Sequence, residues 1–183
     1  MIPPHVHQRR WRWARSLVRG AVGPWARVRV PLDGAEHLPT RGPALVVSNH
    51  RSYADTLWLA SHLPPFVLCG PKPRLMRDPL RRAFVALANG VPDTGEAEWK
   101  ADVAELLSKG EIVLTYPEGG RRVALDELRP WASEAALSGM VPVFPIAHTG
   151  TRLVAGPALA PEGTPEALTA RLRQALVDLG APC

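Results

Sequence analysis

Short apolar segments alternate with longer helical patterns along the chain, and this alternation is the feature that most constrains its fold. Buried strands are predicted for PALVVSNH (43–50), FVLCG (66–70), EIVLTYPEGG (111–120) and MVPVFPIAHTG (140–150). Helices are predicted between them at 52–63, 79–90 and 96–110, and a last one at 164–180. This order predicts a single α/β domain with a mostly parallel central sheet flanked by helices.

Several helix ends carry recognisable signals. Gly110 stands where a helix C-cap is expected, and Gly180 does the same for the last helix. Thr164 is placed as an N-cap, followed by Pro165 at the first helical position.

Positive charge is concentrated at the N-terminus. Residues 1–32 contain no acidic residue and hold seven arginines: Arg9, Arg10, Arg12, Arg15, Arg19, Arg27 and Arg29. Of 22 basic residues in all, 15 are left for the remaining chain, against 17 acidic ones. The net charge of +5 therefore belongs to an N-terminal arm, and a basic surface for nucleic acid is not expected on the globular body.

The arm HQRRWRWARSLVRGAVGPW (7–25) has the pattern of an amphipathic helix that fades at Gly20, Gly23 and Pro24. One face carries Trp11, Ala14, Leu17, Val18 and Ala21, and another carries Arg12, Arg15 and Arg19. Two interpretations stay open and are compatible. The helix lies among lipid headgroups, or it packs on the domain through its tryptophan face.

Other features exclude several classes of protein. No run of about 18 apolar residues occurs, so no transmembrane helix is predicted. No continuous apolar stretch follows the basic N-terminus, so a signal peptide is not expected. Cys69 and Cys183 suggest neither a disulfide framework nor a metal site, which favours a reducing cytosol.

Polar clusters follow three of the predicted strands: Asn49-His50 with Asp55, the segment 117–121, and the segment 148–150. In an open α/β sheet such clusters meet at one edge. A carboxylate that fixes the tautomer of a histidine makes it a general base, although a histidine that caps a helix is the simpler interpretation of one His-x4-Asp pair. The PEGGRR segment suits either a phosphate site or a solvated glycine turn.

Taken together, the ordered blocks resemble the glycerolipid acyltransferase family, typified by bacterial 1-acylglycerol-3-phosphate (lysophosphatidate) acyltransferases. That family carries NH-x4-D, a glycine-containing second block, F-P-E-G-T-R and V-P-x-x-P. The corresponding stretches here are NHRSYAD (49–55), GVPD (90–93), YPEGGR (116–121) and VPVFPI (141–146), within about residues 40–152.

The resemblance implies a catalytic pair, in which His50 deprotonates an acceptor hydroxyl and Asp55 orients His50. It implies substrate-binding roles for Asn49, Ser52, Glu118, Gly119, Arg121, Val141 and Pro142. His148 is interpreted as a structural histidine at a strand end. No metal or bound cofactor is implied, since acyl-CoA or acyl-carrier protein arrives as a co-substrate.

The sequence also departs from the family pattern. The stretch GVPDTGEAEW (90–99) lacks the arginine that helps lysophosphatidate enzymes grip the phosphate, and Gly120 replaces a threonine. Arg122, Arg77, Arg81 and Arg82 are candidates to replace it. Acyl transfer is therefore better supported than the identity of the acceptor.

The resulting expectation is an arm at 1–30 and an acyltransferase domain at 31–183, bound peripherally to the cytoplasmic membrane face. Its expected partners are a lipid acceptor, the membrane surface and an acyl donor, for which acyl-carrier protein is one candidate. No nucleic-acid partner is expected. The alternatives are an enzyme that tailors a specialised metabolite or aminolipid, and a non-catalytic lipid-binding module.

Overall fold

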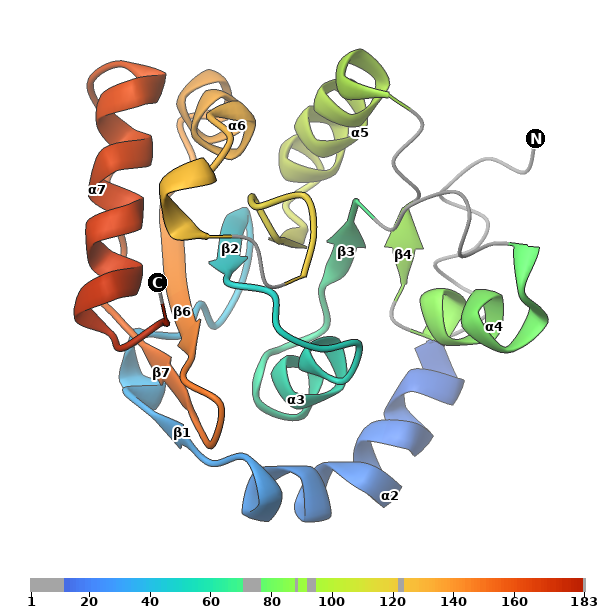
Figure 1. Cartoon of the computed structure of the whole chain (residues 1–183). Helices are drawn as coiled ribbons and strands as arrows, with labels where there is room; N and C mark the ends of the chain where they lie inside the picture. Colours follow the sequence, from blue (N-terminus) through green and yellow to red (C-terminus); the bar gives the residue numbers. More distant parts are fainter. Residues whose placement is uncertain (1–11, 71–76, 88, 92–94, 122–123, 183) are drawn as a thin grey trace.

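The computed structural model describes residues 12–70, 77–87, 89–91, 95–121 and 124–182. Within these ranges seven strands form one sheet in the order β1-β7-β6-β2-β5-β3-β4 (Figure 1). Their bounds are β1 Leu32–Asp33, β2 Ala44–Ser48, β3 Val67–Cys69, β4 Gly90–Val91, β5 Ile112–Thr115, β6 Val143–His148 and β7 Leu153–Ala155. The strands from β6 to β4 are parallel, which confirms the predicted fold class.

The two strands at the other side of the sheet reverse direction. β7 pairs antiparallel with β6, and β1 pairs parallel with β7. The four predicted strands are present, while β1, β4 and β7 were not predicted. These three contain only two or three residues each, and none lies in an apolar run as long as FVLC, from which the equally short β3 was predicted.

The helices are α2 Arg12–Arg29, α3 Asp55–His62, α4 Pro79–Leu87, α5 Glu96–Ser108, α6 Trp131–Gly139 and α7 Pro165–Asp178. Two short 3₁₀ helices, η1 Ala35–His37 and η3 Leu125–Glu127, connect other elements. Thr164 caps α7 as predicted, because its side chain accepts a hydrogen bond of 3.2 Å from the N–H of Ala167. No helix in the described ranges has the length and apolar character needed to span a membrane.

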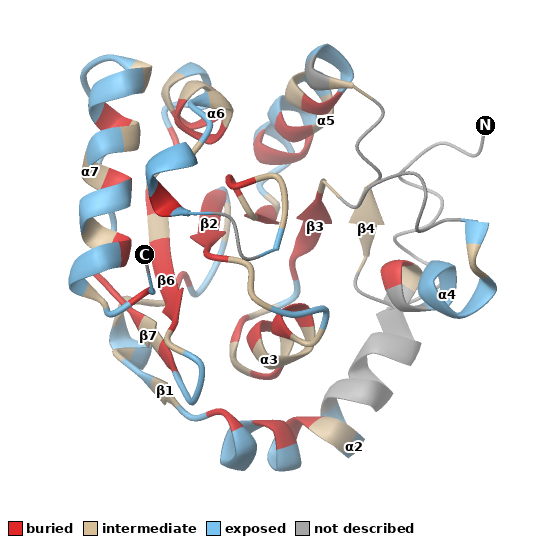
Figure 2. Ribbon diagram, viewed as in Figure 1, coloured by how far each residue is buried: buried red, intermediate tan, exposed pale blue. Residues whose placement is uncertain are grey.

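The sheet separates two apolar cores, as expected for an α/β domain (Figure 2). Leu45 and Val47 point to one face, where α5, α6 and α7 cover them. Ala44 and Val46 point to the other, where α3 and the end of α2 contribute Leu59, Leu63 and Val30. A strand buried on both faces is apolar throughout, which explains the uninterrupted run in β2.

The arm helix differs from the prediction because it does not fade at Gly20, Gly23 or Pro24. α2 continues to Arg29, and its second half packs on α3. Ala26 is fully buried, and Nε of Arg27 donates a 2.7 Å hydrogen bond to the carbonyl of Ser61. Tertiary packing therefore compensates for the weak helix formers in this segment.

Two other helix boundaries also differ. α3 begins at Asp55, not at residue 52, because the preceding backbone turns its N–H groups onto the Asp55 side chain. α4 ends at Leu87 within the described residues, and Gly90 and Val91 pair with β3 as strand β4. A glycine expected to end the helix thus begins a strand.

Strand register determines where the polar clusters lie. β2 sits between β5 and β6, with Val47 opposite Thr115 and Ser48 opposite Ile146. The carboxyl ends of these three parallel strands therefore meet at one edge of the sheet. Val141 and Pro142 precede β6 and lie at the opposite edge, where the carbonyl of Pro142 accepts a hydrogen bond from Leu45.

Candidate active site

The turn that follows β2 folds back on Asp55. One carboxylate oxygen, Oδ2, accepts hydrogen bonds from the backbone N–H of Arg51 (2.6 Å) and of Ser52 (2.8 Å). The same oxygen lies 3.0 Å from Nδ1 of His50. The strand-to-helix turn therefore brings His50 and Asp55 together, as the five-residue spacing predicted.

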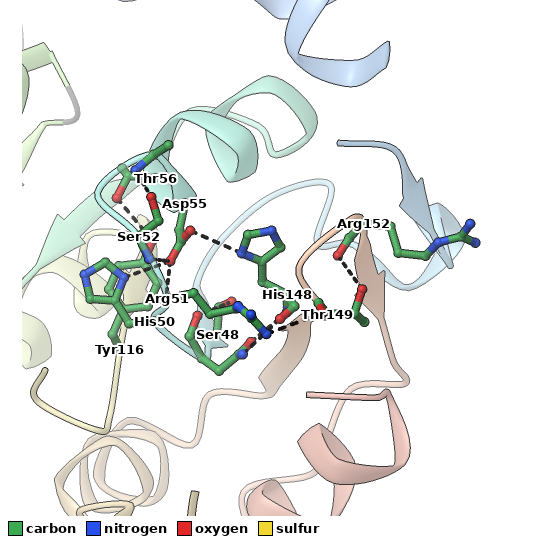
Figure 3. Close-up of polar contacts among 12 residues, drawn as sticks. Ser48, His50, Arg51, Ser52, Asp55, Thr56, Tyr116, His148, Thr149 and Arg152 are labelled. Carbon is green, nitrogen blue, oxygen red and sulfur yellow. Dashed lines mark hydrogen bonds and ion pairs between the residues drawn. The ribbon is translucent and has the colours of Figure 1, made fainter. Parts of the chain in front are cut away.

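The second carboxylate oxygen faces another imidazole. Oδ1 of Asp55 lies 3.1 Å from Nδ1 of His148, at the end of β6. This contact has ion-pair distance but poor hydrogen-bond alignment, so it is mainly electrostatic. Asp55 thus lies between two histidines that come from different strand ends (Figure 3).

Asn49 connects the same two strand ends through the backbone. Its Nδ2 donates to the carbonyl of His148 at 3.1 Å, and its Oδ1 accepts from the N–H of His148 at 2.6 Å. The Asn49 side chain is buried and both its polar ends are engaged with protein. Asn49 therefore links the end of β2 to the end of β6. This structural role is additional to the substrate-binding role that the resemblance implied.

The surroundings of Asp55 keep its carboxylate ionised. Complete burial pushes its pKa upward, but the imidazoles of His148 and His50 and the N–H groups of Ser52 and Arg51 outweigh that effect. The pKa of Asp55 therefore ends well below its usual range. An ionised partner favours the His50 tautomer with its proton on Nδ1, which leaves a lone pair on Nε2.

Glu118 reaches the site from the end of β5. Its Oε2 accepts a 2.8 Å hydrogen bond from the backbone N–H of His50. Burial raises the pKa of Glu118 to about 8. Gly119 follows with a φ of 66°, and an added Cβ would lie 3.3 Å from the guanidinium carbon of Arg129, so a side chain there would be strained and crowded.

Tyr116 forms one wall beside the base. Its ring stacks on the imidazole of His50 with a centroid separation of 4.1 Å and an interplanar angle of 18°. Its hydroxyl lies 3.1 Å from Oγ1 of Thr56, and burial keeps the pKa of Tyr116 well above its usual range. A neutral tyrosine thus holds the plane of the His50 ring.

Arginines gather around Tyr53, on the turn between His50 and Asp55. The guanidinium carbon of Arg121 lies 3.7 Å from the ring centroid, and that of Arg81 lies 5.7 Å from it. Tyr53 and both arginines are exposed. The N-terminal turn of α4 and the loop after β5 therefore place two cations next to the His50–Asp55 turn.

The structure thus gathers most of the predicted site residues around one turn. Around the turn after β2 lie Asn49, His50, Ser52, Asp55, Glu118, Gly119 and Arg121. Val141 and Pro142 are not brought to this turn, because they stand at the amino end of β6 and Val141 is packed in the apolar core. They do not line the His50–Asp55 turn, and a substrate-binding role for them elsewhere stays a prediction.

Part of the predicted second block, residues 92–94, lies outside the described residues, as does Arg122. Sequence reasoning missed the contact of His148 with Asp55 and the stacking of Tyr116 on His50. Both residues were visible at the carboxyl ends of predicted strands, which was the available signal.

Comparison with known proteins gives a family and a fold. A family model described as Acyltransferase matches residues 29–149. No curated protein matches the chain. Among solved structures, the 1-acyl-sn-glycerophosphate (LPA) acyltransferase PlsC from Thermotoga maritima matches with a TM-score of 0.70 and 18% identity, covering 91% of this chain and 80% of that one.

The solved structure supports the fold, and the family model spans more than half of the chain, including every strand end that builds the site. The resemblance indicated by the sequence motifs is thereby confirmed, and the chain belongs to the acyltransferase family.

Proposed function

We propose that this acyltransferase moves a fatty acyl group from an acyl thioester to a hydroxyl of a lysophospholipid-like acceptor, with His50 as the general base. The observation that carries this proposal is the buried Asp55, whose Oδ2 lies 3.0 Å from Nδ1 of His50 while two backbone N–H groups hold it. This arrangement fixes the tautomer of His50 and stabilises the imidazolium that forms.

The chemical step needs no covalent enzyme intermediate. Nε2 of His50 takes the proton of the acceptor hydroxyl, whose oxygen forms a bond to the thioester carbonyl carbon. The carbon–sulfur bond then breaks, and the departing thiolate receives the proton back from His50. Acyl-CoA or acyl-carrier protein is consumed as a co-substrate, so these residues require no resident cofactor or metal for the step.

The proposed acceptor is 1-acylglycerol 3-phosphate or a close relative. Arg121 and Arg81 beside Tyr53 supply guanidinium groups that suit a phosphate. PlsC from Thermotoga maritima, which is similar in fold, is named as an acyltransferase for an acceptor of this kind, and this adds support. Placement at the cytoplasmic membrane face, through the basic arm, belongs to the same proposal.

A second candidate is an acyltransferase that modifies an acceptor without phosphate, such as an aminolipid or specialised metabolite. The absence of arginine from residues 90–99 favours it. Mass spectrometry of products after supplying acyl-CoA and a panel of lysolipids distinguishes the candidates. Turnover confined to acceptors that lack phosphate would reject the lysophosphatidate proposal.

The catalytic assignment is tested by His50→Ala and Asp55→Asn. We expect kcat for thioester consumption to fall on the order of 10³- to 10⁴-fold in each, because the base or its tautomer is lost. His37→Ala, in η1, is the matched control and should retain wild-type turnover. If both site variants consume thioester at the wild-type rate, His50 is not the general base. If the wild-type protein consumes no thioester, the result favours a lipid-binding module.

A further inference from the structure

His148 is a buried titratable residue that the mechanism above does not use. Its side chain is 7% exposed, and Nδ1 lies 3.1 Å from Oδ1 of Asp55. Its backbone is held from both sides by the Asn49 amide. A histidine that merely ended a strand would not need to direct its ring at the buried carboxylate.

We propose that His148 is a positioning residue that acts through Asp55, lowering the pH at which His50 is available as a neutral base. The inference rests on the proposed role of His50. Oδ2 of Asp55 is already occupied by His50, Arg51 and Ser52, so Oδ1 is the oxygen through which another group can act. His148 attracts the negative charge of the carboxylate toward Oδ1.

The direction of the effect is the same for either charge state of His148. A neutral imidazole with its proton on Nδ1 offers positive density to Oδ1 and withdraws part of the carboxylate charge from His50. An imidazolium at that position also repels a proton on His50. Loss of His148 therefore strengthens the pull of Asp55 on the His50 proton in both cases.

Other groups near the pair do not replace His148. Glu118 contacts the backbone N–H of His50, and Tyr116 stacks on its ring as a neutral group. The guanidinium of Arg51 is directed at the carbonyl of Thr149, at a distance of 3.4 Å. Among the described residues, His148 is thus the cationic or donor side chain recorded on Oδ1 of Asp55.

The test compares His148→Phe, His148→Gln and His148→Asn with the matched control His37→Phe. Phenylalanine removes both ring nitrogens, and the glutamine amide occupies the position of Nε2. Asparagine places an N–H donor near the position of Nδ1. Circular dichroism checks beforehand that each variant is folded. If His148→Phe does not fold, His148→Gln still provides the test.

The first readout needs no substrate. In long-range ¹H–¹⁵N NMR of the full chain, the titration midpoint of His50 should rise by roughly 0.5 to 1 pH unit in the Phe and Gln variants. It should stay near the wild-type value in the Asn and control variants. An unchanged or lowered midpoint in the Phe and Gln variants would overturn the proposal.

The second readout is the pH profile of kcat/KM with a long-chain acyl-CoA and 1-acylglycerol 3-phosphate. We expect the Phe and Gln variants to lose about 3- to 10-fold at the acidic limb, the activity equivalent of that shift, with little change at alkaline pH. A uniform loss at every pH indicates a merely structural histidine. Absence of turnover in the wild type refutes the proposed function while the NMR titration still decides the role of His148.

Discussion

Glu118 is a carboxylic acid placed where ionisation is costly. It is 5% exposed, its pKa is raised to about 8 by burial, and its Oε2 accepts the backbone N–H of His50. The neutral acid can hold this contact and still donate a hydrogen bond of its own. At neutral pH the residue therefore behaves more like an amide than like a charged headgroup ligand.

This placement gives the protein a stability that depends on pH. Between about pH 4.5 and pH 8 the folded protein retains a proton on Glu118 that the unfolded chain releases. The contribution of Glu118 to the free energy of unfolding is therefore full below pH 4.5 and declines as the pH rises. Glu118→Gln should remove this decline. Within this pH window the free energy of unfolding of the variant should rise relative to that of the parent by on the order of 1 kcal/mol per pH unit. Urea unfolding at pH 5, 6.5 and 8 measures it.

Glu127→Gln, an exposed residue of η3, is the matched control and should follow the parent. Parallel pH dependences of the parent and Glu118→Gln would contradict a buried acid at this position.

Sequence reasoning reached the His50–Asp55 contact because both residues lie on one turn, where five positions of chain determine the distance. It could not reach the His148–Asp55 contact in the same way. That contact depends on the register of β2 against β6, which brings together residues far apart in the chain. Val141 and Pro142 illustrate the same difficulty. A sequence motif next to a strand can lie at its amino or its carboxyl end, and these two residues lie at the amino end of β6.

At the level of elements, α4 and the loop after β5 approach the site from separate parts of the chain. Arg81 and Arg121 lie over the same Tyr53 ring, at 5.7 and 3.7 Å from its centroid. The ring neutralises no charge, so Arg121 stays available to an anion, whereas Nε of Arg81 also lies 3.8 Å from Oδ2 of Asp78. This pair of elements is where we propose that an acceptor phosphate binds.

Arg121→Ala and Arg81→Ala should each raise KM for a phosphate-bearing acceptor on the order of 10-fold, with a smaller change in kcat, because a charge-assisted contact to the bound acceptor is lost. Initial rates against 1-acylglycerol 3-phosphate and against its dephosphorylated form measure the effect. Arg173→Ala, on the exposed side of α7, is the control. Equal increases for both acceptors would argue against phosphate binding here.

Elements with a strong sequence signal were predictable: α7 has a capping Thr164 with Pro165 at its first position, and β2 is an uninterrupted apolar run. α6 was not predicted, because Trp131–Gly139 is rich in alanine and serine and lacks a clear apolar stripe. It nevertheless forms because Ala132, Ala135 and Ala136 pack closely in the core beside α5 and α7. Small residues at such a contact carry little sequence signal, although they determine how near two helices can approach.

At the level of the whole molecule, charge is divided between an arginine-rich arm and a nearly balanced body. The described end of that arm is anchored on the domain, since the rings of Trp25 and Trp58 lie tilted against each other with centroids 5.4 Å apart and Ala26 is fully buried. Val28 is 85% exposed on the same segment. The arm is thus attached to the body while presenting apolar and basic side chains outward.

We expect deletion of residues 1–19 to reduce binding to anionic vesicles, because it removes five arginines, each worth up to about 1 kcal/mol near such a surface. Replacing Arg9, Arg10, Arg12, Arg15 and Arg19 by glutamine should have the same effect, whereas lysine at these positions should preserve binding. Sedimentation with phosphatidylserine-containing liposomes at two salt concentrations is the measurement. Undiminished sedimentation of the glutamine variant would refute an electrostatic role for the arm.

The Asn49–His148 brace joins residues 99 positions apart in the chain. A ribosome must therefore add 99 residues after Asn49 before this end of the site can close. Before β6 docks beside β2, the turn that carries His50 and Asp55 lacks the contacts that Asn49 and Asp55 make with His148. If the proposed function holds, thioester turnover should therefore begin only after β6 has docked beside β2.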